Sequence, residues 1–268
     1  MPPTHCLYSL TRAQPSSSAA SAAPAACAGY CRRCDRHHGL GQADSIRHAG
    51  LLLARIEKEG RIDLASAGHA ADPELALDHL LGPARGQMFG VLTYQGPDGS
   101  TGVLRAFSGQ YNGRWRVAGW VPPLFDVEQW HQVNQPQEAR IKELGRHIAR
   151  LAEDAPQRRH LLAERRLLSQ QLMKRLHGLY RLTNFRGQTS TLAEAFSGPG
   201  GMATGTGDCC APKLLNYAAR HALRPLGISE FFLGRENRSQ TRQHGVFYPS
   251  CAAKCRPILG FLLCGLQS

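Results

Sequence analysis

The pattern of apolar and polar positions predicts two amphipathic helices in the first third of the chain. Between residues 42 and 64, apolar side chains recur at helical spacing, and Gly60 follows the last of them. The apolar positions are Ile46, Leu51, Leu52 and Ile56. Residues 72–81 repeat the pattern, with Pro73 suited to a first helical turn. We expect both helices to cover a sheet.

Residues 87–107 predict a β-hairpin, because the apolar runs MFGVLTY and VLRAFSG flank a turn segment rich in Gly, Pro and Asp. The next segment places aromatic residues beside arginines. Aromatic rings and guanidinium groups stack on unpaired RNA bases. The candidates for such contacts are Arg114, Trp115, Arg116 and Trp120. The alternative is that these aromatic side chains complete a core.

Residues 137–182 predict two helices, broken at residues 154–156, whose leucine-rich seams would pack antiparallel. From Glu138 to Arg181 there are eleven Lys or Arg and five Asp or Glu, so this segment supplies half of the chain's formal charge of +12. Exposed cations of this kind bind RNA phosphates. The candidates are Arg140, Arg146, Arg158, Arg159, Arg165, Arg166, Lys174 and Arg175. A solvated helical spacer is the alternative.

The rest of the chain contains a glycine-rich segment, two cysteine-bearing helices and a strand-like run between them. We therefore expect an α/β fold, in which helices cover a small sheet and an antiparallel helical hairpin is inserted into the core. The expected segments are a flexible, Cys-containing tail over 1–41, a first part of the core over 42–135, the helical hairpin over 136–182 and a cysteine-rich second part over 183–268.

Composition narrows the class of protein. The chain has 268 residues, 42% of them hydrophobic, and can bury a core. A pI near 9.6 favours a polyanionic partner, and RNA is the leading candidate. The sequence contains neither an apolar run of 18 residues nor a convincing signal peptide, so we expect no membrane association and a cytoplasmic location. Nine cysteines spread along the chain predict mostly reduced thiols.

A first candidate metal motif lies near the N-terminus. Cys27, Cys31, Cys34, His37 and His38 fall within twelve residues, and thiolates and imidazoles at such spacing can converge on one zinc ion. Four ligands within so short a segment would strain the tetrahedron. The alternative is a basic, cysteine-containing loop.

A second candidate metal motif follows from the order of elements after the hairpin. Zinc deaminases of nucleobases have one ligand on a first helix, two on a second, and a glutamate two residues after the first ligand. Here the ligands would be Cys210, Cys251 and Cys255, which makes a cytidine-deaminase-like core one form of the expected fold. Pro212 occupies the glutamate position, and the second pair has C-x3-C spacing, so deaminase chemistry is in doubt. A structural zinc site and buried cysteines are the alternatives.

Several separated blocks resemble the N-terminal region of long RluA-type pseudouridine synthases. These blocks are GQMFGVLTY, VLRAFSGQ, GWVPPLFD, YRLTNFRGQT, GTGDCCAPKLLNYAARHALRPLGISEF and FYPSCAAKCRPILGFLLCGL. They cover about residues 86–266. The resemblance implies a role in isomerising uridine to pseudouridine in structured RNA, chemistry that requires neither a metal nor an organic cofactor.

The catalytic motif of that family is missing from this sequence. The family's aspartate lies in a G-R-L-D motif, which Gly60-Arg-Ile-Asp63 resembles only superficially. We therefore expect an RNA-binding accessory domain that works with a synthase in trans, and no catalytic residue is carried over. The alternative functions are a divergent zinc-dependent deaminase or hydrolase and a purely structural zinc module.

Overall fold

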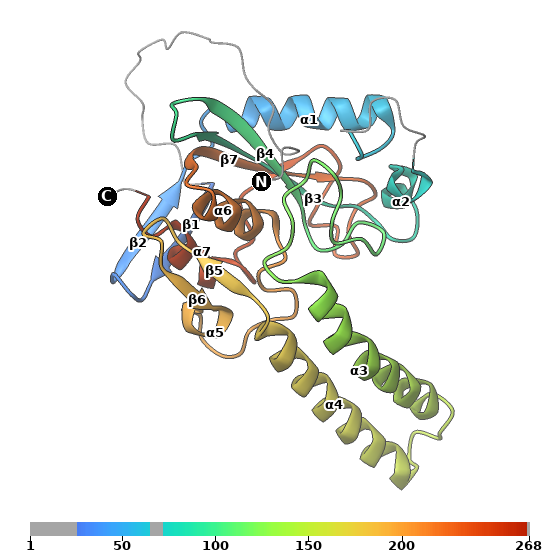
Figure 1. Cartoon of the computed structure of the whole chain (residues 1–268). Coiled ribbons are helices and arrows are strands. Elements are labelled where there is room, and N and C mark those ends of the chain that lie inside the picture. Colours follow the sequence, from blue (N-terminus) through green and yellow to red (C-terminus); the bar gives the residue numbers. More distant parts are fainter. Residues whose placement is uncertain (1–25, 65–71, 267–268) are drawn as a thin grey trace.

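The computed structural model describes residues 26–64 and 72–266, and these residues form a mixed α/β fold, as predicted (Figure 1). Its central sheet is antiparallel, with strand order β4-β3-β7-β8. The strands are β3 (Gln87–Gln95), β4 (Thr101–Phe107), β7 (Arg224–Leu233) and β8 (Phe247–Tyr248). The predicted hairpin is β3 with β4, and the turn between them contains Gly96, Asp98 and Gly99.

Both faces of the sheet are covered, so β3 and β7 are apolar on both sides. Helix α1 (Ser45–Glu59) packs on the face that carries Phe89, Val91 and Phe231, and it ends at Gly60 as predicted. Helix α6 (Cys210–Arg220) packs on the opposite face, which carries Leu92, Leu104 and Ile228 (Figure 1). Helix α7 (Arg256–Leu263) lies beside α6 and packs against β1 and β2, so the two cysteine-bearing helices are neighbours.

Residues 27–40, expected within a flexible tail, instead form a β-hairpin of β1 (Cys27–Cys31) and β2 (Arg36–Leu40) that packs on α7. Glycines make this close approach possible. A Cβ atom on Gly260 would lie 2.1 Å from the carbonyl carbon of Tyr30, and one on Gly29 would lie 2.4 Å from the nitrogen of Gly260. The backbones of the hairpin and α7 are thus in direct contact. Residues 1–25 of the predicted tail lie outside the described part of the chain.

A helical hairpin projects from the body (Figure 1). Helices α3 (Val127–Ile148) and α4 (Pro156–His177) pack against each other around Leu144, Ile148 and Leu161. Helix α4 begins at Pro156, next to the predicted break, whereas α3 begins ten residues earlier than expected. At the base of the hairpin, the N–H of Arg181 donates to the carbonyl oxygen of Leu124 at 3.1 Å, which brings its two ends together.

Shorter elements complete the fold. Residues 72–81, expected as one helix, form a 3₁₀ turn (Pro73–Leu75) and the single-turn α2 (Asp78–Leu81). A two-stranded ribbon, β5 (Arg181–Thr183) with β6 (Thr189–Thr191), leads into α5 (Leu192–Ala195). Within the described ranges, none of the helices combines the length and hydropathy needed to cross a bilayer.

Candidate metal centre and cysteine pocket

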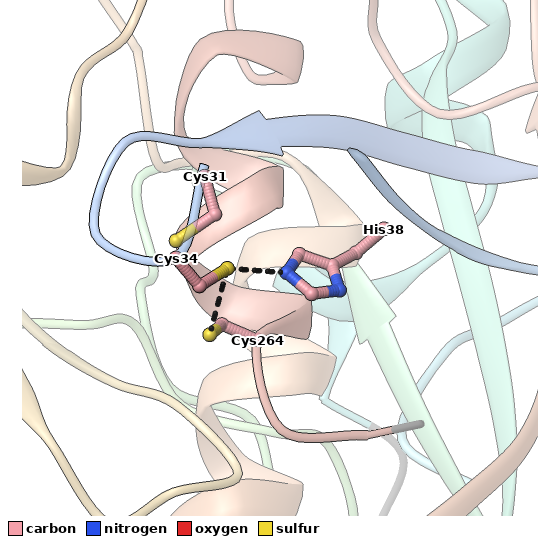
Figure 2. A group of neighbouring side chains, drawn as sticks. All are labelled: Cys31, Cys34, His38 and Cys264. Carbon is pink, nitrogen blue, oxygen red and sulfur yellow. Dashed lines mark hydrogen bonds between the residues drawn. The ribbon is translucent and has the colours of Figure 1, made fainter. Parts of the chain in front are cut away.

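Four potential metal ligands meet where the β1–β2 hairpin rests on the end of α7 (Figure 2). Cys31 ends β1, Cys34 lies in the hairpin turn, and His38 is on β2. Cys264 directly follows α7. The ligand atoms of these four residues all lie within 4.8 Å of one another, and no other group of His, Cys, Asp or Glu in residues 26–64 and 72–266 is as compact.

The spacing of these atoms suits zinc. The sulfur of Cys34 lies 3.0 Å from the Nε2 atom of His38 and 3.5 Å from the sulfur of Cys264 (Figure 2). A tetrahedral zinc ion with ordinary Zn–S and Zn–N bonds holds its ligand atoms about 3.5–3.8 Å apart. Three thiolates and one imidazole could therefore hold a metal such as zinc with small side-chain adjustments.

The pKa values of Cys34 and His38 are shifted in the direction that favours metal binding, whereas that of Cys264 is shifted the other way. Desolvation acts to raise the pKa of the Cys34 thiol, but hydrogen bonds from Cys264 and Cys31 outweigh it, and the pKa of Cys34 is lowered. Desolvation and the hydrogen bond with Cys34 raise the pKa of Cys264 to about 12. Burial, reinforced by Arg186, lowers the pKa of His38, which keeps its ring neutral and able to coordinate.

This centre uses only part of the N-terminal motif. Cys27 is buried in the main core, and the ring of His37 packs on Tyr30 with a centroid distance of 5.3 Å. The sequence interpretation placed all four ligands within twelve residues and missed Cys264, which is 230 residues from Cys34. The usable signal was the C-x2-C-x3-H spacing from Cys31 to His38, which supplies three ligands and requires a fourth from elsewhere.

A second thiol cluster lies where α6 and α7 begin. Cys209 is the N-cap of α6, Cys255 is the N-cap of α7, and Cys251 lies in the turn before α7. The three thiols lie close enough to shift one another's pKa values. Hydrogen bonds from Cys209 and Cys255 strongly lower the pKa of the Cys251 thiol, whereas the hydrogen bond to Cys251 raises that of Cys209.

The predicted ligands Cys210, Cys251 and Cys255 do not form a compact metal-holding group among the described residues. Cys210 is fully buried, and its thiol donates to the carbonyl oxygen of Met88 on β3 at 3.3 Å. A Cβ atom on Gly90 would lie 2.6 Å from the Cβ atom of Cys210, so the helix start is pressed against the sheet there. Cys210 is thus a core residue, and Cys209 takes its place beside Cys251 and Cys255.

A pocket of about 510 Å³ opens next to this thiol cluster. Cys209, Cys251 and Glu230 line it. Glu230 is buried on β7, and its carboxylate accepts a hydrogen bond from the Ser250 hydroxyl at 2.7 Å. Desolvation raises the pKa of Glu230 to about 7. A carboxyl group that titrates near neutrality in a pocket is a feature of many functional sites.

The aromatic residues proposed to stack on RNA bases are instead core residues. Trp115 packs edge-on against Phe125 with a centroid distance of 4.9 Å, and Trp120 donates from its ring N–H to the carbonyl oxygen of Ile62. Only 6% of Trp115 and 3% of Trp120 are exposed, so neither ring can stack on a base. Arg114 and Arg116 are exposed, but Arg114 forms an ion pair with Asp72 at 2.6 Å.

The candidate phosphate contacts lie on the α3–α4 hairpin. The exposed members are Arg140, Arg146, Arg159, Arg165, Arg166, Lys174 and Arg175, and Arg158 is half-buried. Arg140 is engaged by Glu143 and Glu164 across the hairpin.

Comparison with models of known protein families, with curated proteins and with solved structures gave no match.

Proposed function

We propose that this protein is an RNA-associated accessory domain of pseudouridine synthesis, which binds structured RNA and positions it for a synthase domain. The observation that carries this proposal is the helical hairpin, which projects from the body and exposes most of its cations (Figure 1). The blocks that resemble the N-terminal region of long RluA-type synthases supply the link to pseudouridine.

The arrangement of cations on α4 supports contact with phosphates. Arg158 and Arg165 are seven residues apart, as are Arg159 and Arg166, so each pair lies along one line of the helix, two turns apart. Trp115 and Trp120, which precede the hairpin, are buried and cannot stack on bases. We therefore expect binding that depends on RNA shape and phosphate, with little preference for base sequence.

The Cys31, Cys34, His38 and Cys264 centre serves a structural role in this proposal. Four protein ligands fill a tetrahedral coordination shell and leave no position for a substrate or water, as in structural zinc sites. A zinc ion there would fasten the β1–β2 hairpin to the end of α7.

The test is a salt titration of RNA binding. Fluorescence anisotropy with a labelled RNA stem-loop is measured for the parent and for a variant with Arg158, Arg159, Arg165 and Arg166 changed to Gln. The control changes four exposed cations elsewhere, Arg47, Lys58, Arg220 and Arg238, to Gln. We expect the α4 variant to lose at least tenfold in affinity and to reduce the slope of log K against log salt by about three. A parent affinity insensitive to salt, or equal losses in the two variants, would refute the proposal.

A second candidate function has its own supporting observation. The sheet order β4-β3-β7, with α6 between β4 and β7 and α7 after β7, follows the element order of nucleobase deaminases, and thiols from both helix starts meet at the pocket. This supports a deaminase-like core and a zinc-dependent hydrolase. The test is ammonia release from oligoribonucleotides containing cytosine or adenine, with Cys251→Ser as the inactive control. No release from either type of oligonucleotide would remove this candidate.

A further inference from the structure

We propose that a pocket lined by the β1–β2 hairpin and the start of α7 binds an unpaired RNA nucleotide, whose base stacks on Tyr30 or Phe196 and whose phosphate pairs with Arg256. This inference rests on the proposed RNA-binding function and deepens it, because it adds a contact to single-stranded RNA that the α3–α4 hairpin does not provide. The pocket has a volume of about 400 Å³, within the usual size range of small-molecule sites.

Three segments that are distant in the sequence line this pocket. Tyr30 and His37 belong to the β1–β2 hairpin, Phe196 follows α5, and Arg256 begins α7. Both the hairpin and α5 pack against α7, which brings the segments together (Figure 1). The rest of the lining consists of Gly, Ala, Ser and Pro residues, whose small side chains leave room for a flat ring.

The register of the β1–β2 hairpin presents two rings on one face. Tyr30 pairs directly with His37, so both side chains project from the same side of the two strands, and their rings contact each other. Cys31 and His38 fall on the opposite side, because side chains alternate along a strand. The metal centre and the pocket therefore use opposite faces of one hairpin, and a bound metal would leave the two rings accessible.

Contacts outside the pocket hold its aromatic residues in place. The Tyr30 hydroxyl donates to the Asp35 carboxylate, which fixes the ring. On the other segment, Ser197 donates from its backbone N–H and from its hydroxyl to the carbonyl oxygen of Pro257, at 2.9 and 2.8 Å. These two hydrogen bonds anchor the backbone next to Phe196 to the first turn of α7. A base can therefore stack on these rings without the protein first ordering them.

The charge of the lining favours a ligand that carries phosphate. Among the described residues that line this pocket, Arg256 is exposed and none is acidic. Two other large pockets differ, because Asp208 and Glu230 line one and Asp208 and Glu138 line the other. A guanidinium group binds phosphate through paired hydrogen bonds. An apolar peptide would need no such cation, so the rings and the charge together favour an RNA nucleotide.

This pocket supplies the aromatic contact that the sequence assigned to Trp115 and Trp120. Both of those rings are buried, whereas Tyr30 and Phe196 are half-buried and His37 is exposed. Stacking on an aromatic side chain tolerates any base, because every base has a π-face. The pocket should therefore bind a nucleotide because it is unpaired, and not because of its sequence.

The test compares two RNA probes on the full-length protein by fluorescence anisotropy, a blunt duplex and the same duplex with a single-stranded extension. The parent should bind the extended probe about fivefold or more tightly than the blunt one. Phe196→Leu keeps the apolar volume but removes the flat ring, so it should lose this preference and retain the affinity for the blunt duplex. Phe196→Tyr should keep the preference. Tyr217→Leu is the matched control, because Tyr217 is half-buried against the same core cluster but lies on α6, outside the pocket.

The two probes separate this inference from the proposed function. Equal affinity of the parent for both probes would overturn the pocket and leave duplex binding by the α3–α4 hairpin standing. Binding of the extended probe alone would support the pocket and overturn the role of the helical hairpin, and binding of neither probe would overturn both. Equal losses of the preference in Phe196→Leu and Tyr217→Leu would overturn the assignment of the stacking residues.

Two further variants keep the proposal testable if Phe196→Leu does not fold. Tyr30→Leu should lower the preference and leave the slope of log K against log salt unchanged, because stacking releases no counterions. Arg256→Gln should reduce that slope by about 0.7 on the extended probe and leave it unchanged on the blunt duplex. Iodouracil placed in the extension should photocrosslink to Tyr30, His37 or Phe196, as mass spectrometry of the peptides would show. Crosslinks confined to other residues would overturn the pocket.

Discussion

At the scale of single residues, His177 illustrates how burial makes stability depend on pH. It lies at the end of α4, is only 7% exposed, and packs edge-on against Tyr180 with a centroid distance of 6.2 Å. Its Nε2 atom has no hydrogen-bond partner. Burial lowers the pKa of His177 below its usual 6.5, so the folded protein holds this ring neutral.

His177 should therefore destabilise the fold as the solution becomes acidic. Below pH 6.5 the unfolded chain binds a proton at this residue, whereas the folded chain resists protonation. The free energy of unfolding therefore decreases as the pH is lowered. His177→Leu should remove this contribution. The Tm of the variant should therefore rise relative to that of the parent as the pH is lowered from 7.5 to 5. Thermal unfolding at several pH values measures it, and a difference independent of pH would contradict the assignment.

Cys264 should be far more important for stability than other buried cysteines. Cys264→Ala removes one ligand of the metal centre, and we expect a loss of about 3 kcal/mol or more, with Tm lower by roughly 6–12 °C. The control is Cys27→Ala, which removes an equally buried sulfur that is not a ligand. Calorimetry before and after chelation with EDTA provides the measurement. If both variants lose the same stability, and neither loses zinc, the centre is not a metal site.

Single residues also show where sequence reasoning stops. The choice between Cys209 and Cys210 depends on which thiol the first turn of α6 turns toward the sheet, and the two residues are adjacent and identical. Trp115 and Trp120 beside arginines look the same in a sequence whether they are exposed or buried. Tertiary packing determines which cysteine faces the sheet and whether the tryptophans are buried. The local spacing of residues contains no information on either.

At the scale of elements, the contact between the β1–β2 hairpin and α7 depends on Gly260. Any larger side chain would collide with the backbone of Tyr30, and Cys264 lies one helical turn further along. The hairpin and the metal centre therefore depend on the same glycine, although it is not a ligand.

Gly260→Ala should consequently destabilise the protein by about 3 kcal/mol or more, since the clash is with backbone atoms that cannot rotate away. It should also reduce zinc content, as elemental analysis would show. Gly50→Ala is the matched control, because a Cβ atom there meets nothing within 4 Å and the residue lies inside α1. That change should stabilise by about 0.5–1 kcal/mol. Normal zinc content and stability in Gly260→Ala would contradict the proposed contact.

Elements with a strong local signal were predicted well. The amphipathic period and Gly60 located α1, and the Gly- and Pro-rich turn located the β3–β4 hairpin. The β1–β2 hairpin was missed because its strands are short, rich in cysteine and histidine, and held by α7 from the far end of the chain. Local pattern contains no information about such a partner.

At the scale of the whole molecule, the α3–α4 hairpin has a core of its own. Leu144, Ile148 and Leu161 form a small cluster apart from the two large clusters on the faces of the sheet. Only the base of the hairpin, through Trp130 and Tyr180, shares the core of the body. The sequence predicted the two helices from their periodicity, but not that their distal halves would stand apart.

The distal part of the hairpin should open independently of the body. A cluster of three buried side chains provides much less burial than the sheet cores, so local unfolding there costs less free energy. In hydrogen exchange followed by mass spectrometry, amides of residues 140–165 should exchange at least tenfold faster than those of β3 and β7. Similar protection in both regions would show that the hairpin and body unfold as one unit.

The distance along the chain between the metal ligands has a consequence for biosynthesis. Three residues of the proposed zinc centre are made early, but the fourth, Cys264, is 230 residues beyond Cys34. In the proposed centre, the early thiols would stay without their fourth partner until the ribosome has made residue 264. Zinc loading would then be a late step of synthesis, and a chain broken off before Cys264 could not complete it.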